Sequence, residues 1–244
     1  MNNKTNMQTN ANIPLFIAAR LENKKDFERK IWITLPVTKP CFYEAVGAVC
    51  DSWDDFKIGM YRTNIYGFHN NKLMKAPFSL VNFLAARLNK LTVEQALKLI
   101  MIMESCYEFS AVSEIIDFTY HSDRYELITG IRTYWQLGEH RKNELDRKTV
   151  PPIVIQCINT ESFGRETALQ ENGEFTPLGY LSSKDGFGKT VKERPIPDCW
   201  DVKDLNGDDI YGDLYDDDAF YFIIDEDEDC TGVSESDFDC DDGI

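Results

Sequence analysis

The sequence predicts an α+β protein, elongated, in which small β-sheet and helix subdomains flank a helical middle segment and an acidic C-terminal tail follows. Three observations predict this arrangement. Short apolar segments rich in β-branched residues occur on both sides of the middle, apolar residues recur there at helical spacing, and the charge changes sharply at residue 198. We therefore expect a flexible N-terminus, a small α+β subdomain, a mainly helical subdomain, a second small α+β subdomain and an acidic tail, at residues 1–12, 13–78, 79–150, 151–197 and 198–244.

The first subdomain should contain a β-β-α-β unit. Residues 13–19 and 31–35 are short and apolar, as in buried strands, and a charged hairpin-like stretch separates them. Pro40 suits a first helical turn, so a helix should run from there to about Cys50. A third strand is expected near residues 57–66, where apolar and polar residues alternate. The helix should cover one face of this sheet.

Apolar periodicity and a capping motif predict helices in the middle of the chain. Leucine and phenylalanine recur at helical spacing over residues 80–91. Thr92 should cap the next helix, because Gln95 stands at the reciprocal capping-box position. Further helices are expected at residues 112–120 and 133–145.

The second α+β subdomain should begin at a joint marked by Pro151 and Pro152. Residues 153–158 suggest a strand or a buried extended segment, residues 160–170 a short helix, and residues 174–181 a hairpin. Two further prolines, Pro195 and Pro197, should close the folded body.

The tail dominates the charge of the chain, which totals −16. Residues 198–244 carry 19 carboxylates and one basic residue, whereas the preceding 197 residues carry 25 basic and 23 acidic residues. Such a run stays solvated and is attracted to basic surfaces, so we expect residues 226–244 and the first 12 residues to be mobile and residues 219–224 to be the only tail segment that pairs. Direct binding of duplex DNA is disfavoured, because the tail has the charge sign of nucleic acid. A tail that only improves solubility is the simpler alternative.

Motifs for chemistry are incomplete. Residues 185–190 end like a phosphate-binding loop but lack its first glycine, and Asp204, Asn206 and Asp208 start like a calcium-binding loop that then departs from the pattern. The three histidines fall in no catalytic or zinc motif, and the seven scattered cysteines suit reduced thiols. The N-terminus lacks the features of a signal peptide. We expect a cytoplasmic protein that is not an enzyme and has no cofactor or metal.

Several segments together resemble one family. In residues 158–181, Ser162, Phe163, Gly164 and Arg165 precede a Phe-Thr-x-x-Gly-Tyr hairpin. Four other segments match in the same order along the chain: residues 31–36, 80–95, 115–131 and the step Leu137–Gly138. These residues are similar to motifs of the ArdA-type antirestriction proteins of conjugative plasmids and transposons.

The resemblance implies an elongated α+β homodimer without catalysis or cofactor. Its surface carboxylates would mimic DNA phosphates and occupy the DNA groove of type I restriction–modification enzymes. The expected partner contacts are carboxylates of the middle, of the family-matching positions and of the tail: Asp117, Asp123, Glu126, Glu139, Glu144, Glu161, Glu166, Asp216, Asp217, Asp218, Asp225, Glu226, Asp227, Glu228 and Asp229. Four aromatic residues are expected in the core or a dimer interface: Tyr120, Trp135, Phe163 and Tyr180.

The charge of the body favours an alternative. Residues 1–91 carry +6, residues 92–146 carry −5 and residues 147–197 carry +1, whereas a phosphate mimic should be negative throughout. The chain could instead be an accessory interaction protein of a mobile element, without antirestriction activity. Its acidic tail would then bind another basic partner.

Overall fold

The computed structural model of the protein describes residues 15–65, 70–105, 109–145, 149–183 and 194–213. These residues combine helices with two small antiparallel sheets, so the predicted α+β class is confirmed. They belong to one compact unit that ends at Asp213. No helix in the described part of the chain is long and apolar enough to cross a membrane.

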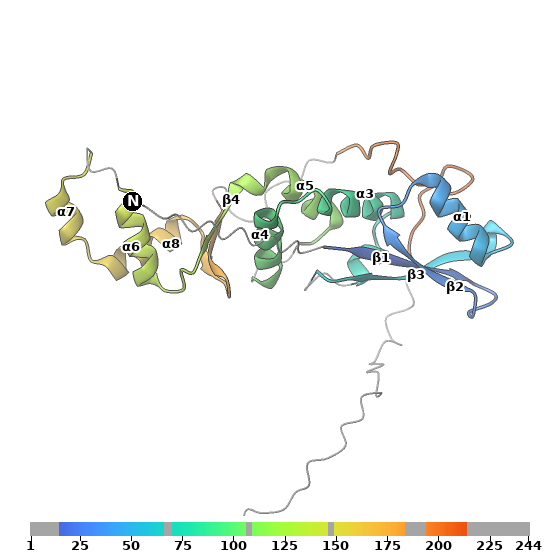
Figure 1. Ribbon diagram of the computed structural model, residues 1–244, viewed down its shortest axis with the longest axis horizontal. Helices are drawn as coiled ribbons and strands as arrows, with labels where there is room; N and C mark the ends of the chain where they lie inside the picture. Colours follow the sequence, from blue (N-terminus) through green and yellow to red (C-terminus); the bar gives the residue numbers. More distant parts are fainter. Residues whose placement is uncertain (1–14, 66–69, 106–108, 146–148, 184–193, 214–244) are drawn as a thin grey trace, which may run out of the picture. The chain divides into compact units, whose positions relative to one another are not determined.

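The first sheet has three antiparallel strands in the order β2-β1-β3 (Figure 1). These strands are β1 (Ile17–Asn23), β2 (Lys30–Leu35) and β3 (Phe56–Thr63). Alternate residues of β1 are fully buried, among them Ile17, Ala19 and Leu21. The sequence predicted all three strands, although β1 begins four residues later than expected.

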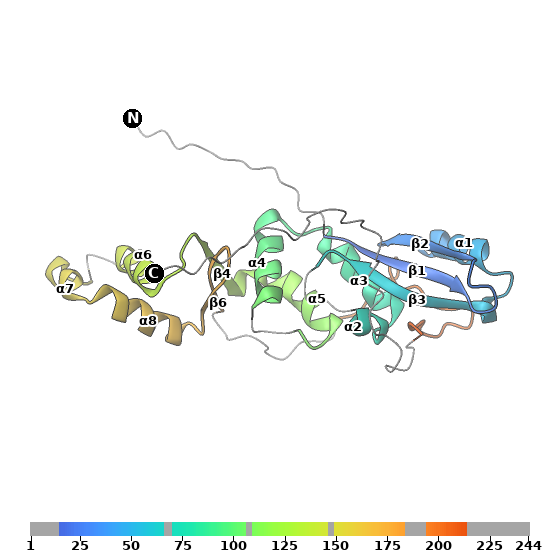
Figure 2. The same cartoon turned by 90° about the horizontal axis from the view of Figure 1, so that it is seen from below.

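Helices cover one face of this sheet and leave the other uncovered by described helices (Figures 1 and 2). The covering helices are α1 (Lys39–Val49) and α3 (Phe78–Leu88). Phe42 of α1 and Phe78 of α3 are both fully buried, with ring centroids 4.5 Å apart. Pro40 lies in the first turn of α1, as predicted.

The middle of the chain is helical, as predicted. Besides α3 it contains α2 (Asn70–Met74), α4 (Val93–Glu104) and α5 (Val112–His121). The capping box of α4 is present: the Thr92 hydroxyl accepts from the N–H of Gln95, and the Gln95 side chain accepts from the N–H of Thr92. Apolar side chains of α3, α4 and α5 join those of the first sheet in one core.

The second sheet has the order β4-β6-β5. The hairpin of β5 (Glu174–Phe175) and β6 (Gly179–Ser183) was predicted, whereas β4 (Tyr125–Thr129) was not. A short 3-10 turn (Ser122–Arg124) leads from α5 into β4, which pairs antiparallel with β6 along its whole length. This sheet therefore draws its strands from both sides of the subdomain boundary that the sequence suggested near residue 150.

Three helices accompany the second sheet: α6 (Tyr134–Glu144), α7 (Pro152–Cys157) and α8 (Thr160–Gln170). The strand predicted at residues 153–158 is wrong, because most of this segment forms α7. Pro151 and Pro152 supply the fixed φ angles of a first helical turn. The segment pairs with no strand in the described part of the chain, and Ile153 and Val154 are exposed.

The sequence predicted that the acidic tail begins at residue 198. In the structure, the chain remains packed against the body beyond this residue. Val202 and Ile210 are buried, and the carbonyl of Ile210 accepts from the N–H of Phe78 at 2.7 Å. Gly212 forms a bridge with Ile58 of β3. Two apolar residues among the acids thus anchor the chain as far as Asp213. The predictions for residues 1–12, 219–224 and 226–244 lie outside the described residues.

Candidate partner-binding site

The crossing of α6 and α8 positions most of the predicted carboxylates. The two helices run antiparallel, with Gly138 beside Thr160 and Gly164 beside Tyr134. A Cβ atom on either glycine would lie 1.9 Å from a backbone oxygen of the other helix. Each helix begins at a side-chain cap, since Thr133 accepts from the N–H of Gln136 and Asn159 from the N–H of Ser162. Backbone-to-backbone packing therefore fixes one helical layer that carries acidic residues from both helices.

Arg141 of α6 gathers three carboxylates. Its Nη1 donates to Glu144 at 2.8 Å, and its Nη2 donates to Glu171 at 3.1 Å and to Glu126 of β4. The Arg141 side chain is 14% exposed. Burial alone would lower the pKa of Arg141, but the hydrogen bonds to the three carboxylates outweigh it and hold that pKa well above its ordinary value.

A buried tyrosine completes this network. Tyr180 is fully buried, and its hydroxyl donates to Oε2 of Glu171 at 3.0 Å. Burial raises the pKa of Tyr180 above its ordinary value, and the negative charge of Glu171 raises it further, by a smaller amount. Tyr180 therefore stays neutral and keeps donating to Glu171.

The network borders an open groove with a volume of about 580 Å³. Glu126, Arg141, Glu144 and Glu171 lie along it beside the half-buried Phe163. Three carboxylates against one guanidinium leave two negative charges at this site. Such a groove is suited to a cationic side chain of a partner.

The other predicted carboxylates of this region lie on the same two helices. Glu139 of α6 approaches Lys142 at 3.5 Å and accepts from the hydroxyl of Thr160 at 3.1 Å. Glu161 and Glu166 of α8 are exposed, and each meets a residue four positions later: Arg165 at 3.4 Å and Gln170 at 3.2 Å. The structure thus brings together five predicted carboxylates, Glu126, Glu139, Glu144, Glu161 and Glu166.

Asp117 does not belong to this set. It lies on α5 with a side chain only 15% exposed, and it pairs with Arg194 at 3.2 Å and with His121 at 3.7 Å. Its carboxylate ties Arg194 to α5, and little of the Asp117 side chain is open to a partner. Asp123 is exposed in the turn after α5. The predicted tail contacts lie outside the described residues: Asp216, Asp217, Asp218, Asp225, Glu226, Asp227, Glu228 and Asp229.

The predicted aromatic residues divide into two pairs. Tyr180 is in the core, as expected, whereas Phe163 is half-buried and is not part of a core cluster. Tyr120 and Trp135 are 40% and 56% exposed and are not core residues. Two guanidinium groups stack on the Tyr120 ring, those of Arg87 at 3.8 Å and Arg194 at 4.1 Å.

The sequence did not identify Arg141 and Glu171 as parts of the site. Arg141 stands three residues before Glu144, a spacing that pairs charges on a helix, and this was the available signal. Glu171 follows the C-terminus of α8, where the helix dipole disfavours a carboxylate. Here Arg141 and the hydroxyl of Tyr180 donate to the Glu171 carboxylate.

Metal chemistry has no support in the described ranges, which contain no group of three or more His, Cys, Asp or Glu residues that could hold an ion. The calcium-loop-like segment is a turn, in which Oδ1 of Asp204 accepts from the N–H groups of Asn206 and Asp208, both at 2.8 Å. The phosphate-loop-like segment, residues 185–190, lies in a range that the structure does not describe.

No protein-family model matches this chain, and no curated protein matches it significantly.

Proposed function

We propose that the protein is a non-catalytic antirestriction protein that binds type I restriction–modification enzymes by mimicking the charge of DNA. The observation that carries the proposal is the convergence of Glu126, Glu144 and Glu171, from three separate parts of the chain, on the single cation Arg141. Their side chains remain 44%, 50% and 30% exposed. They can therefore meet basic residues that normally contact phosphates.

The architecture also supports the proposal. Two small sheets with helices between them along the chain agree with what the resemblance to the ArdA-type family implies. Gly138 and Gly164, which stand at family-matching positions, form the helix crossing that supports the acidic layer. The matched residues therefore have a physical role in this chain.

Exposed apolar residues support a homodimer as part of this proposal. Ile153 and Val154 of α7, Leu169 of α8 and Trp135 of α6 are each about half exposed or more. All four belong to the helices α6, α7 and α8, and apolar side chains that gather on a surface are typical of a protein–protein contact. A second copy of the chain would bury them.

The alternative, an accessory protein with another basic partner, is favoured by a different observation. Most predicted body carboxylates already have basic partners, and the described residues between 125 and 183 carry seven acids and four bases. That balance is weakly negative, whereas duplex DNA carries about one charge per 1.7 Å. In this alternative the tail would supply most of the attraction.

A plating assay tests the proposal. Unmodified phage is plated on a host with a type I restriction system, with and without the protein, and we expect the protein to raise the efficiency of plating. Deleting residues 226–244 should weaken this relief without removing it. If the full-length protein protects phage from no type I system, the accessory function replaces the proposal.

A further inference from the structure

The uncovered face of the first sheet carries a regular set of polar and aromatic side chains. Residues paired across antiparallel strands point to the same face. The pairing of β2 and β3 with β1 therefore creates three rows: Lys30–Glu22–Lys57, Trp32–Arg20–Met60 and Thr34–Ala18–Arg62. The opposite face holds Ile17, Ala19 and Leu21 against α1 and α3, so these rows face away from the core.

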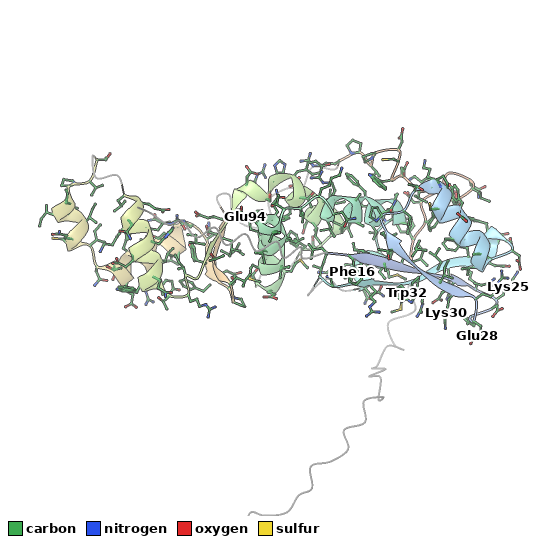
Figure 3. The ribbon with its side chains drawn as sticks, in the orientation of Figure 1. Phe16, Lys25, Glu28, Lys30, Trp32 and Glu94 are labelled. Atoms are coloured by element: carbon green, nitrogen blue, oxygen red, sulfur yellow. The ribbon has the colours of Figure 1, made fainter. Side chains whose placement is uncertain are left out.

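Two aromatic rings are exposed beside these rows. Trp32 is 47% exposed on the edge strand β2, and Phe27, in the loop before it, is 62% exposed. Each ring has a cation next to it: the Arg20 guanidinium lies 5.8 Å from the Trp32 centroid, and Lys57 Nζ lies 5.4 Å from the Phe27 centroid. Figure 3 shows Trp32 and Lys30 on the side of the sheet away from the helices.

The charge of this face is positive. It contains four basic residues and one carboxylate, Glu22, which pairs with Arg20 and Lys57. Glu22 and Lys57 are both buried, so the exposed charge comes from Lys30, Arg62 and part of Arg20. Asp213 also approaches Lys57, at 3.8 Å. Lys30 and Arg62 are exposed, at diagonal positions on either side of the Trp32–Arg20 row. In a chain with a net charge of −16, this is a local reversal of sign.

We propose that this sheet face binds single-stranded nucleic acid. Unpaired bases would stack on Trp32 and Phe27, and phosphates would contact Lys30, Arg62 and the exposed part of Arg20. Exposed aromatic rings beside cations on a sheet face offer both of the contacts that single strands use, stacking and backbone neutralisation. Duplex DNA keeps its bases paired and cannot use the rings. An acidic protein segment would use the cations alone. This inference does not depend on the proposed antirestriction function.

Fluorescence anisotropy of a labelled 20-nucleotide oligothymidylate, titrated with the full-length protein at 50 mM salt, tests the proposal. We expect a Kd of about 10⁻⁴–10⁻⁶ M, the usual range of non-specific binding. Trp32→Ala should weaken binding about 5- to 150-fold, the value of one stacked base, and Trp32→Phe should restore most of it. Leu205→Ala, at an apolar side chain that is 71% exposed in the segment after residue 198, should bind like the wild type.

A charge variant gives a second measurement. Lys30→Gln with Arg62→Gln should lower the slope of log K against log salt by about 1.4, because each lost phosphate contact removes about 0.7. The pair Lys75→Gln and Lys90→Gln, also exposed, is the matched control and should leave the slope unchanged. Melting curves of all variants establish that they are folded.

Four outcomes would overturn the proposal. They are no binding at 100 µM protein, equal affinity for a duplex of the same length, wild-type affinity in a folded Trp32→Ala variant, and equally tight binding of polyglutamate that Trp32→Ala does not weaken. The last would identify an acidic protein segment as the partner.

Discussion

Gly138 of α6 and Gly164 of α8 are in backbone contact: a Cβ atom built on Gly164 would lie 2.7 Å from the backbone nitrogen of Gly138. No side chain separates the helices at this point. The carboxylates of α6 and α8 and the guanidinium of Arg141 depend on this spacing. The two glycines are therefore structural determinants of the acidic site.

Replacing either glycine by alanine should destabilise the protein. The added methyl group would meet backbone oxygen that cannot rotate away, and overpacking of this kind costs about 1–3 kcal/mol or more in free energy of unfolding. The higher helix propensity of alanine returns only about 1 kcal/mol. Gly47→Ala, in α1, is the control. A Cβ atom built on Gly47 has no neighbouring atom within 4 Å, so this substitution should stabilise the protein slightly. Urea denaturation of Gly138→Ala, Gly164→Ala and Gly47→Ala tests this, and wild-type stability of the first two would contradict the close crossing.

Loss of the central cation should also destabilise the fold. Arg141→Gln leaves Glu126, Glu144 and Glu171 close together without their shared donor. We expect a loss of about 1–3 kcal/mol, the range for hydrogen bonds to charged groups, reduced because the carboxylates are partly exposed to solvent. Arg165→Gln, which removes an exposed ion pair on α8, should change the stability by less than about 1 kcal/mol. Equal stability of the two variants would show that Arg141 does not organise the site.

Alkaline pH should lower the stability through Tyr61 and Tyr180. Burial raises the pKa of both phenols, whereas unfolded tyrosines ionise near pH 10. Above pH 10 the unfolded state therefore binds fewer protons than the folded state. The stability is complete below pH 10 and falls above it by up to about 2.7 kcal/mol per pH unit for the two residues.

Urea denaturation between pH 9 and pH 11.5 measures this slope. The double variant Tyr61→Phe and Tyr180→Phe should show a flatter profile than the wild type, and identical profiles would contradict the burial of the two phenols. At neutral pH, Tyr180→Phe should cost about 1 kcal/mol through the lost hydrogen bond to Glu171. Tyr61→Phe should cost nothing, since the Tyr61 hydroxyl has no hydrogen-bond partner among the described residues.

Local patterns predicted much of the fold. The apolar periodicity of residues 80–91 and the Thr92 capping box act within a few residues, and both are present in the structure. The strand β4 escaped prediction because its side chains are only half-buried and show no alternation. Helix α7 was mistaken for a strand because Ile153, Val154 and Ile155 favour strands locally, whereas Pro151 and Pro152 begin a helical turn there.

The site was harder to predict, because its parts are distant in sequence. Arg141 lies 15 residues from Glu126 and 30 residues from Glu171, and only the pairing of β4 with β6 and the packing of α6 on α8 bring them together. The acidity of residues 198–213 likewise concealed that Val202 and Ile210 anchor this segment. Net charge predicts solvation of a segment but not the burial of single apolar residues within it.

The central claim is that exposed carboxylates of the body substitute for DNA phosphates. The decisive variant reverses four of them that the structure leaves exposed: Asp123→Lys, Glu144→Lys, Glu161→Lys and Glu166→Lys. A matched control reverses four exposed acids elsewhere, with the same change in net charge: Glu28→Lys, Glu44→Lys, Asp54→Lys and Asp198→Lys. The control variant should melt near the wild-type temperature, because exposed charges contribute about 1 kcal/mol or less each. The body variant should melt somewhat lower, because Glu144→Lys places a second cation beside Arg141, so the comparison is made at a temperature at which both variants are folded.

The most direct measurement is competition between this protein and a labelled duplex carrying the recognition site, for a purified type I restriction–modification enzyme at 150 mM salt. The account predicts that the wild type and the control variant displace the duplex and that the body variant displaces it at least about tenfold less effectively. Equal displacement by all three proteins, or displacement by none of them, would contradict the claim.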